Sequence, residues 1–137
     1  MFAKATLTGT LVGFVFLFFS GWIFYDFLAI DYFSQHFVNM PSTMATDMNF
    51  IAFGVLVEAY LISLIYRKWA KGNYSPKSGF KLGAIIGLFI GLGINMVTMG
   101  TIALIDFQAS LLDAAWSVFS FGIAGSLNGW VFKTLHH

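Results

Sequence analysis

The sequence predicts an all-α integral membrane protein with four transmembrane helices in a single domain. Hydrophobic residues make up 58% of its 137 residues and charged residues only 9%, whereas roughly a quarter of the residues are charged in soluble domains. Four apolar segments are long enough to cross a hydrocarbon core of roughly 30 Å, which takes about 20 helical residues. All seven Lys and Arg residues also fall on one side of these segments, as a membrane topology requires.

The four spans are separated by connections of unequal length. The first span could be a secretory signal peptide, but its apolar stretch is too long and no small-residue cleavage site follows it. About five residues separate the third and fourth spans, so these two helices are expected to form an antiparallel hairpin. The predicted spans are 7–28, 49–66, 82–105 and 111–132.

The connections contain residues typical of turns and helix starts. In the longest connection, 29–48, the first part is aromatic and amphipathic, which favours an extension of the first helix or a helix along the membrane surface. Pro41 then breaks the pattern, and the Ser, Thr and Asp residues after it can cap the next helix. The connection KWAKGNYSPKSG is basic and rich in turn formers, so it is expected to be a loop.

The basic residues predict the orientation of the chain. The positive-inside rule assigns the side rich in Lys and Arg to the cytoplasm. Both termini and the connection between the second and third spans are therefore expected to be cytoplasmic. The basic residues are Lys4, Arg67, Lys68, Lys71, Lys77, Lys81 and Lys133.

The two halves of the chain show a weak internal similarity. Gly9 and Gly13 in the first span correspond to Gly83 and Gly87 in the third, and LAIDYF at the end of the first corresponds to ALIDFQ at the end of the third. Because both halves begin on the same side, the similarity predicts a parallel repeat of two helical hairpins. The alternative is coincidence, since apolar helices share residue types easily.

Glu58 is the most informative single residue. It lies near the middle of the second span, where a carboxylate is costly and is a functional hypothesis by default. No Lys or Arg occurs inside any span. We therefore expect Glu58 to be protonated, hydrogen-bonded by neutral groups, neutralised by a cation or solvated in an internal cavity. The alternative interpretation is a neutral carboxylic acid that only pins the helix packing.

Small and polar residues form a stripe on each predicted helix, and several lie near the depth of Glu58. They can line a polar seam that takes a ligand or an ion. The packing alternative is that they only bring helices together, because membrane helices associate through GxxxG spacings such as Gly9/Gly13, Gly83/Gly87/Gly91 and Gly125/Gly129. The candidate seam comprises Glu58, Asn95, Thr98, Ser117, Ser120 and Asn128.

A second candidate is a set of acids and one imidazole toward the side opposite the basic residues. Carboxylates and imidazole can bind divalent cations, but no spacing here matches a ligand motif, so no metal site is assigned. The alternative is a group of solvated acids at the membrane interface. The set comprises Asp26, Asp31, His36, Asp106 and Asp113. The four Trp residues lie near the span ends and are interpreted as interfacial anchors.

The sequence predicts neither a cofactor nor a catalytic site. The chain has no Cys, and its three His residues are His36 and the terminal His136 and His137, so helix-borne His pairs for haem are absent. The terminal pair is read either as native sequence or as the remainder of an expression tag. No nucleophile elbow, P-loop or zincin helix occurs. The net charge of +1 gives no reason to expect a nucleic-acid partner.

The segments GWIFYDFLAIDYF, LGAIIGLFIGLG and FGIAGSLNGWVFK resemble small four-helix bacterial membrane proteins of uncharacterised function, of the DUF1761 type. The resemblance covers most of the chain and rests on Gly, Trp and aromatic patterning. It implies four helices and a bacterial inner-membrane location. It carries no known catalytic residues, and no site is transferred from it.

Three functional hypotheses follow from these patterns. The first is a membrane protein that handles a small molecule, a proton or a cation through the seam around Glu58. The second is a non-catalytic accessory or packing subunit of a larger membrane complex. A membrane-embedded enzyme is third, because no catalytic motif was found. Four helices make a thin bundle, so a transport pathway is expected to need a homo-oligomer.

Overall fold

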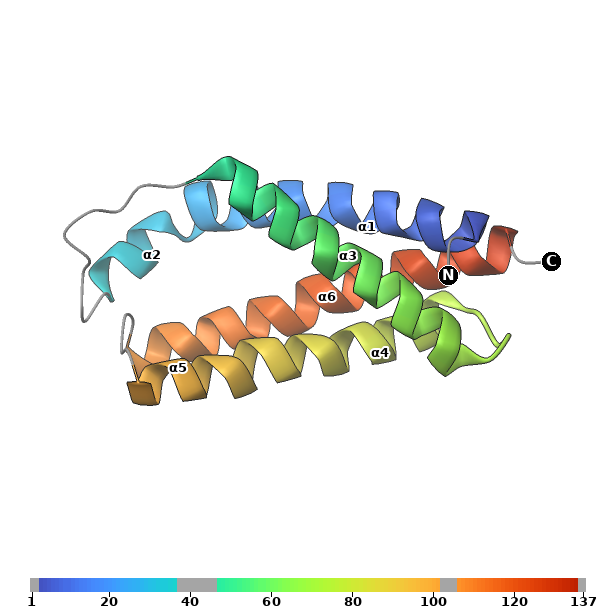
Figure 1. Cartoon of the computed structure of the whole chain (residues 1–137). Helices are drawn as coiled ribbons and strands as arrows, with labels where there is room; N and C mark the ends of the chain where they lie inside the picture. The colour runs from blue at the N-terminus through green and yellow to red at the C-terminus, as the bar shows by residue number, and fades with distance from the viewer. Residues whose placement is uncertain (1–2, 37–46, 102–105, 136–137) are drawn as a thin grey trace.

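The computed structural model describes residues 3–36, 47–101 and 106–135, and in these ranges the chain forms helices and no strands (Figure 1). Four helical stretches are long and apolar enough to cross a membrane, which confirms the predicted all-helical class. Two stretches contain a π-helical segment. The elements are α1 (Lys4–Ile23), η1 (Phe24–Leu28), α2 (Ile30–Gln35), α3 (Met48–Ala70), α4 (Pro76–Leu88), η2 (Phe89–Ile94), α5 (Asn95–Thr101) and α6 (Phe107–Leu135).

Several helices are longer than the apolar runs indicated. The third stretch begins at Pro76 and not at residue 82, because Pro76 occupies the first helical turn and the side chain of Ser75 accepts a hydrogen bond from the Ser78 N–H at 3.1 Å. Pro and Ser are turn formers, but they are equally suited to a helix start. Asp47 caps α3 as expected, since its Oδ1 accepts from the Asn49 N–H at 2.9 Å. The proposed break at Pro41 and the end of the third span lie outside the described residues.

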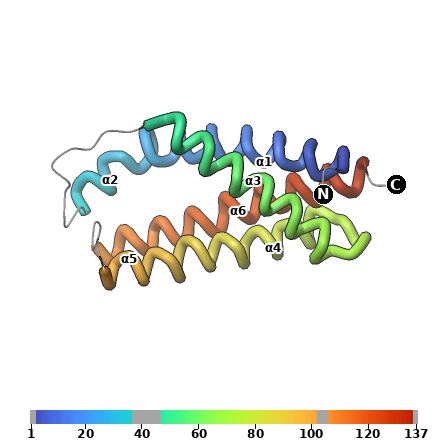
Figure 2. Tube along the Cα trace, in the orientation of Figure 1, coloured from blue at the N-terminus to red at the C-terminus, as the bar shows by residue number. Residues whose placement is uncertain are grey.

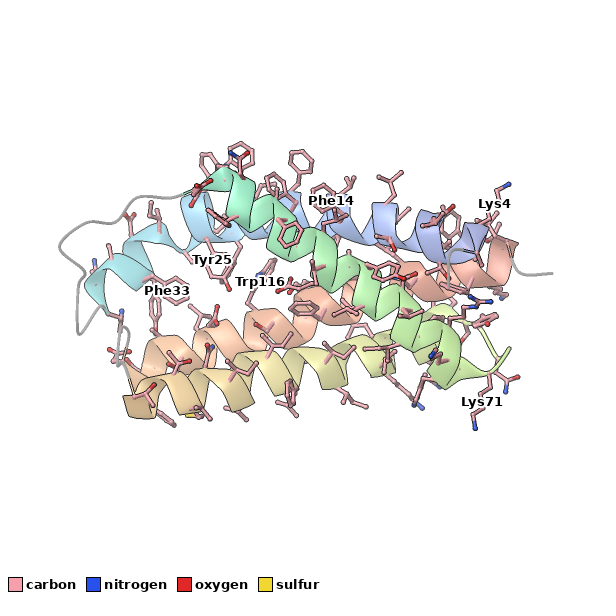
Figure 3. All side chains as sticks on the ribbon, in the orientation of Figure 1. Lys4, Phe14, Tyr25, Phe33, Lys71 and Trp116 are labelled. Atoms are coloured by element: carbon pink, nitrogen blue, oxygen red, sulfur yellow. The ribbon has the colours of Figure 1, made fainter. Side chains whose placement is uncertain are left out.

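The start of α1, the end of α3, the start of α4 and the end of α6 meet at one end of the bundle (Figure 2). The basic residues therefore gather at this end, as Lys4 and Lys71 illustrate in Figure 3. Helices α2 and α5 mark the opposite end. We call these the basic end and the acidic end of the bundle.

Helices α4 and α6 pack backbone to backbone through glycines spaced four residues apart. A Cβ atom at Gly79 would lie 1.9 Å from the carbonyl oxygen of Gly125, and one at Gly83 would lie 1.9 Å from that of Phe121. At Gly87 the corresponding distance to the carbonyl oxygen of Ser117 is 2.3 Å. Any side chain would force the helices apart, so this stripe has the packing role that its spacing predicted.

Helix α1 packs on α3 and α6 near the basic end. A Cβ atom at Gly9 would lie 2.4 Å from Asn128 Oδ1 and 2.8 Å from Ser63 Oγ. The Ser63 hydroxyl donates to the backbone oxygen of Thr6 at 2.9 Å. The buried Tyr66 hydroxyl accepts from the Ser75 N–H at 2.9 Å and thereby ties the end of α3 to the start of α4.

Helix α3 joins the bundle over only half of its length. Its buried residues all lie in its second half, from Ala59 to Ala70, and no residue from Met48 to Glu58 is buried. Figure 1 shows α3 crossing the other helices at an angle. The first half of α3 therefore leans away from the α4–α6 hairpin and leaves room at the acidic end.

Replacing Gly83 with Ala should lower the free energy of unfolding by about 1–3 kcal/mol, because the new methyl group overpacks a backbone contact. Gly54→Ala is the matched control, since a Cβ atom there has no neighbour within 4 Å and Ala is the better helix former. Thermal unfolding in detergent should give a lower Tm for Gly83→Ala alone. Equal Tm values for the two variants would contradict the packing described here.

Candidate functional site

A cavity of about 320 Å³ lies between the first half of α3 and the rest of the bundle. Its lining comes from α1, η1, α3, η2 and α6. Ile51, Val55 and Glu58 come from α3 at steps of four and three, as one helical face requires. The other polar residues that line the cavity are Asp26, Asp113, Ser117 and Ser120, and the aromatic ones are Phe18, Trp22, Tyr25, Trp116 and Phe121.

The π-helical segment η1 places two of the lining residues. The Ala29 N–H donates to the carbonyl oxygen of Phe24 at 2.7 Å, a bond that spans five residues. Tyr25 and Asp26 lie within this wider turn, and both line the cavity. Single π turns inside α-helices are frequent at functional sites.

Glu58 lines the cavity and is half-buried near the middle of α3. Within the described ranges its carboxylate has no hydrogen bond and no ion pair. Among the residues that the structure describes, the lining contains no Lys, Arg or His. Ser117 and Ser120, which were assigned to the same seam from their depth, line the cavity too. The structure therefore brings these three candidates together.

Asp113 is held by two donors from other elements. The Tyr25 hydroxyl donates to Asp113 Oδ1, and the Asn95 side-chain amide donates to Asp113 Oδ2 at 2.6 Å. These bonds join η1, α5 and α6 at the acidic end of the cavity. Asn95 thus belongs to the cavity region through Asp113, although it does not line the cavity itself.

An aromatic pair fixes the wall beside this cluster. The rings of Phe24 and Trp116 stack with centroids 4.2 Å apart and planes within 4°. Figure 3 shows Tyr25 and Trp116 extending toward one another from η1 and α6. The Trp116 indole is therefore held in place at the edge of the cavity.

The other two seam candidates lie elsewhere. Thr98 is exposed on α5 and does not line the cavity. Asn128 is 1% exposed, and its amide donates to the backbone oxygen of Ala124 at 3.0 Å. Asn128 lies against Gly9 toward the basic end. The predicted seam is thus divided into a cavity around Glu58 and a separate buried contact around Asn128.

The outer set of acids and imidazole is also divided. Asp26 and Asp113 line the cavity, whereas Asp31 is exposed on α2. His36 Nε2 lies 3.8 Å from Asp106 Oδ2, and the Asp106 N–H donates to the His36 carbonyl oxygen at 3.0 Å. In the described ranges no three His, Asp or Glu residues are placed to hold a metal ion.

The aromatic wall was missed because Trp22 and Trp116 were interpreted as interfacial anchors. Trp116 lies three residues after Asp113 and next to Ser117, and this spacing could have placed it on the same helix face. No sequence signal pointed to Tyr25, whose position depends on the π turn. Comparison with family models, curated proteins and solved structures finds no match for this chain.

Tyr25→Phe should lower the free energy of unfolding by about 1–3 kcal/mol, because an oxygen of Asp113 then loses its donor. Tyr32→Phe makes the same chemical change at a hydroxyl without a hydrogen bond in the described ranges. Denaturation in detergent should show a loss for Tyr25→Phe only. The assigned network would be wrong if both variants unfolded like the wild type.

Proposed function

We propose that this chain is a multi-pass protein of the bacterial inner membrane that handles a small molecule, a proton or a cation in the cavity around Glu58. One observation carries the proposal. Glu58 lines a cavity formed by α1, η1, α3, η2 and α6, and among the described residues the lining holds no basic side chain and the Glu58 carboxylate has no hydrogen bond. A group that only pins the packing would need a partner.

The energetics of a membrane interior support this role. An ionised, unpaired carboxylate near the middle of a span costs at least about 2.5 kcal/mol on insertion scales. Glu58 avoids this cost by holding a proton or by pairing with a cation. A proton and a cation can exchange on Glu58 within the cavity. Ser117 and Ser120 line the same cavity and supply neutral hydroxyl groups.

The bundle orientation is proposed from its charges. All seven basic residues belong to the basic end, and the positive-inside rule assigns such an end to the cytoplasm. Both termini are then cytoplasmic, and the cavity lies toward the outer half of the membrane. The resemblance to bacterial proteins of the DUF1761 type supports the proposed inner-membrane location. The resemblance and the two-hairpin repeat both stay predictions.

A second copy of this chain is the proposed partner in a transport pathway, because four helices enclose little space by themselves. The alternative function is a non-catalytic accessory subunit of a larger membrane complex. It is favoured by the exposed first half of α3, where Phe50 and Phe53 are 77% and 66% exposed. A Cβ atom at Gly54 would have no other described atom within 4 Å. A partner helix can pack closely against such a surface.

The orientation predicts which sites can be labelled from outside. The chain has no Cys, so a single one can be introduced at the exposed positions Ser34 and Asn73. In intact cells a membrane-impermeant maleimide should modify Ser34→Cys and leave Asn73→Cys unmodified until the membrane is opened. The reverse pattern would invert the proposed topology.

The role of Glu58 predicts an infrared signal. Difference spectra between about pH 5 and about pH 9 should show a protonated carboxyl band that Glu58→Gln removes, because a site that exchanges a proton for a cation changes the protonation of its carboxyl group and an amide has no such group. Asp31→Asn, a change at an exposed acid outside the cavity, should keep the band. Identical spectra for wild type and Glu58→Gln would sink the proposal that Glu58 is a proton or cation site.

A further inference from the structure

We infer that the ligand of this cavity is a small organic cation, an amine or quaternary ammonium that carries one apolar ring. The inference rests on the proposed function and names the class of ligand. It follows from the charge of the lining, from the residues that form the walls and from the volume.

The charge of the lining selects a cation. In the described part of the chain three carboxyl groups line the cavity, from Asp26, Glu58 and Asp113, and no basic side chain does. Both oxygens of Asp113 already accept hydrogen bonds from Tyr25 and Asn95. Asp26 on η1 and Glu58 on α3 therefore remain as the carboxylates that can pair with a ligand, and Glu58 is the one on the α3 side. An anionic ligand would meet only like charges.

The walls favour an organic cation over a metal ion. Ca²⁺ takes six to eight oxygen ligands and Mg²⁺ demands octahedral geometry. Although three carboxyl groups line the cavity, in the described ranges no three His, Asp or Glu residues are placed so that they could hold one metal ion. Most of the lining is apolar or aromatic instead. A cation over the face of Trp or Tyr gains about 0.5–2 kcal/mol, the more so when it is desolvated.

The volume limits the size of the ligand. A cavity of about 320 Å³ is at the small end of ligand pockets, which span roughly 300–1,000 Å³. A ligand with one ring and one ammonium group therefore has a suitable size for this cavity. The stacking of Phe24 on Trp116 and the bonds to Asp113 hold two walls in place. Pre-organised walls reduce the entropy lost on binding.

Benzyltrimethylammonium is a suitable probe, because 2,2-dimethylpropylbenzene has the same shape without the charge. Tryptophan fluorescence of the purified full-length chain in detergent, corrected with empty micelles, gives the Kd of each compound. The cation should bind at least tenfold more tightly than its neutral analogue. Its affinity should rise with pH, since protons compete for the same carboxylate.

The variants separate the contributions to binding. Glu58→Gln, a nearly isosteric change, should weaken binding of the cation at least tenfold, which is about 1.4 kcal/mol. Trp116→Leu should weaken it severalfold, and Asp31→Asn should leave it unchanged. The cation and its neutral analogue are compared on the wild-type chain. This comparison therefore tests the inference even if Trp116→Leu fails to fold.

Two results would overturn the ligand class: equal binding of the cation and its neutral analogue, or equal binding of the cation by wild type and Glu58→Gln. If the infrared band of Glu58 is present while benzyltrimethylammonium does not bind, the inferred ligand is wrong and the proton or cation site stands. If that band is absent, the proposed function itself is wrong.

Discussion

The backbone contact between α4 and α6 is the constraint on which the other packing depends. Gly79, Gly83 and Gly87 lie so close to carbonyl groups of α6 that no side chain fits between the helices. With no hydrophobic driving force between helices in lipid, such close approach provides the van der Waals contact that holds them together. The two helices are thus in direct backbone contact, and α1 packs against Asn128 of α6 through Gly9.

The cavity is a consequence of how α3 joins this platform. Ser63 and Tyr66 fix the second half of α3 to α1 and to the start of α4, but no residue of α3 before Ala59 is buried. The bundle is therefore closed at the basic end and open at the acidic end. The bonds of Asp113 to Tyr25 and Asn95 link the remaining helices across this open part and maintain the shape of the cavity.

Glu58 is the residue on which the proposed function depends. From the sequence, a packing role and a site role were equally reasonable. A packing role requires a hydrogen-bond partner, whereas within the described ranges the carboxylate has none and faces a cavity with aromatic walls. In the proposed function, a ligand reaches Glu58 on the side of α3 that faces the cavity, away from the α4–α6 contact.

The glycine stripe could be interpreted from the sequence as a packing contact or as a lined seam, and the contact with α6 decides for packing. The sequence predicted the four helices, the basic residues at one end and the Asp47 cap. These features depend on residue type and helical period alone. It also placed Glu58, Ser117 and Ser120 at one depth. The packing of the helices shows in addition that Asn128 lies apart from them, that Thr98 is exposed and that the Tyr25 hydroxyl donates a hydrogen bond to Asp113. The depth of a residue and the helix face on which it lies follow from the 3.6-residue period of the α-helix. The angle at which α3 crosses the bundle and the π turn of η1 depend on contacts between helices, which the sequence of one segment does not encode.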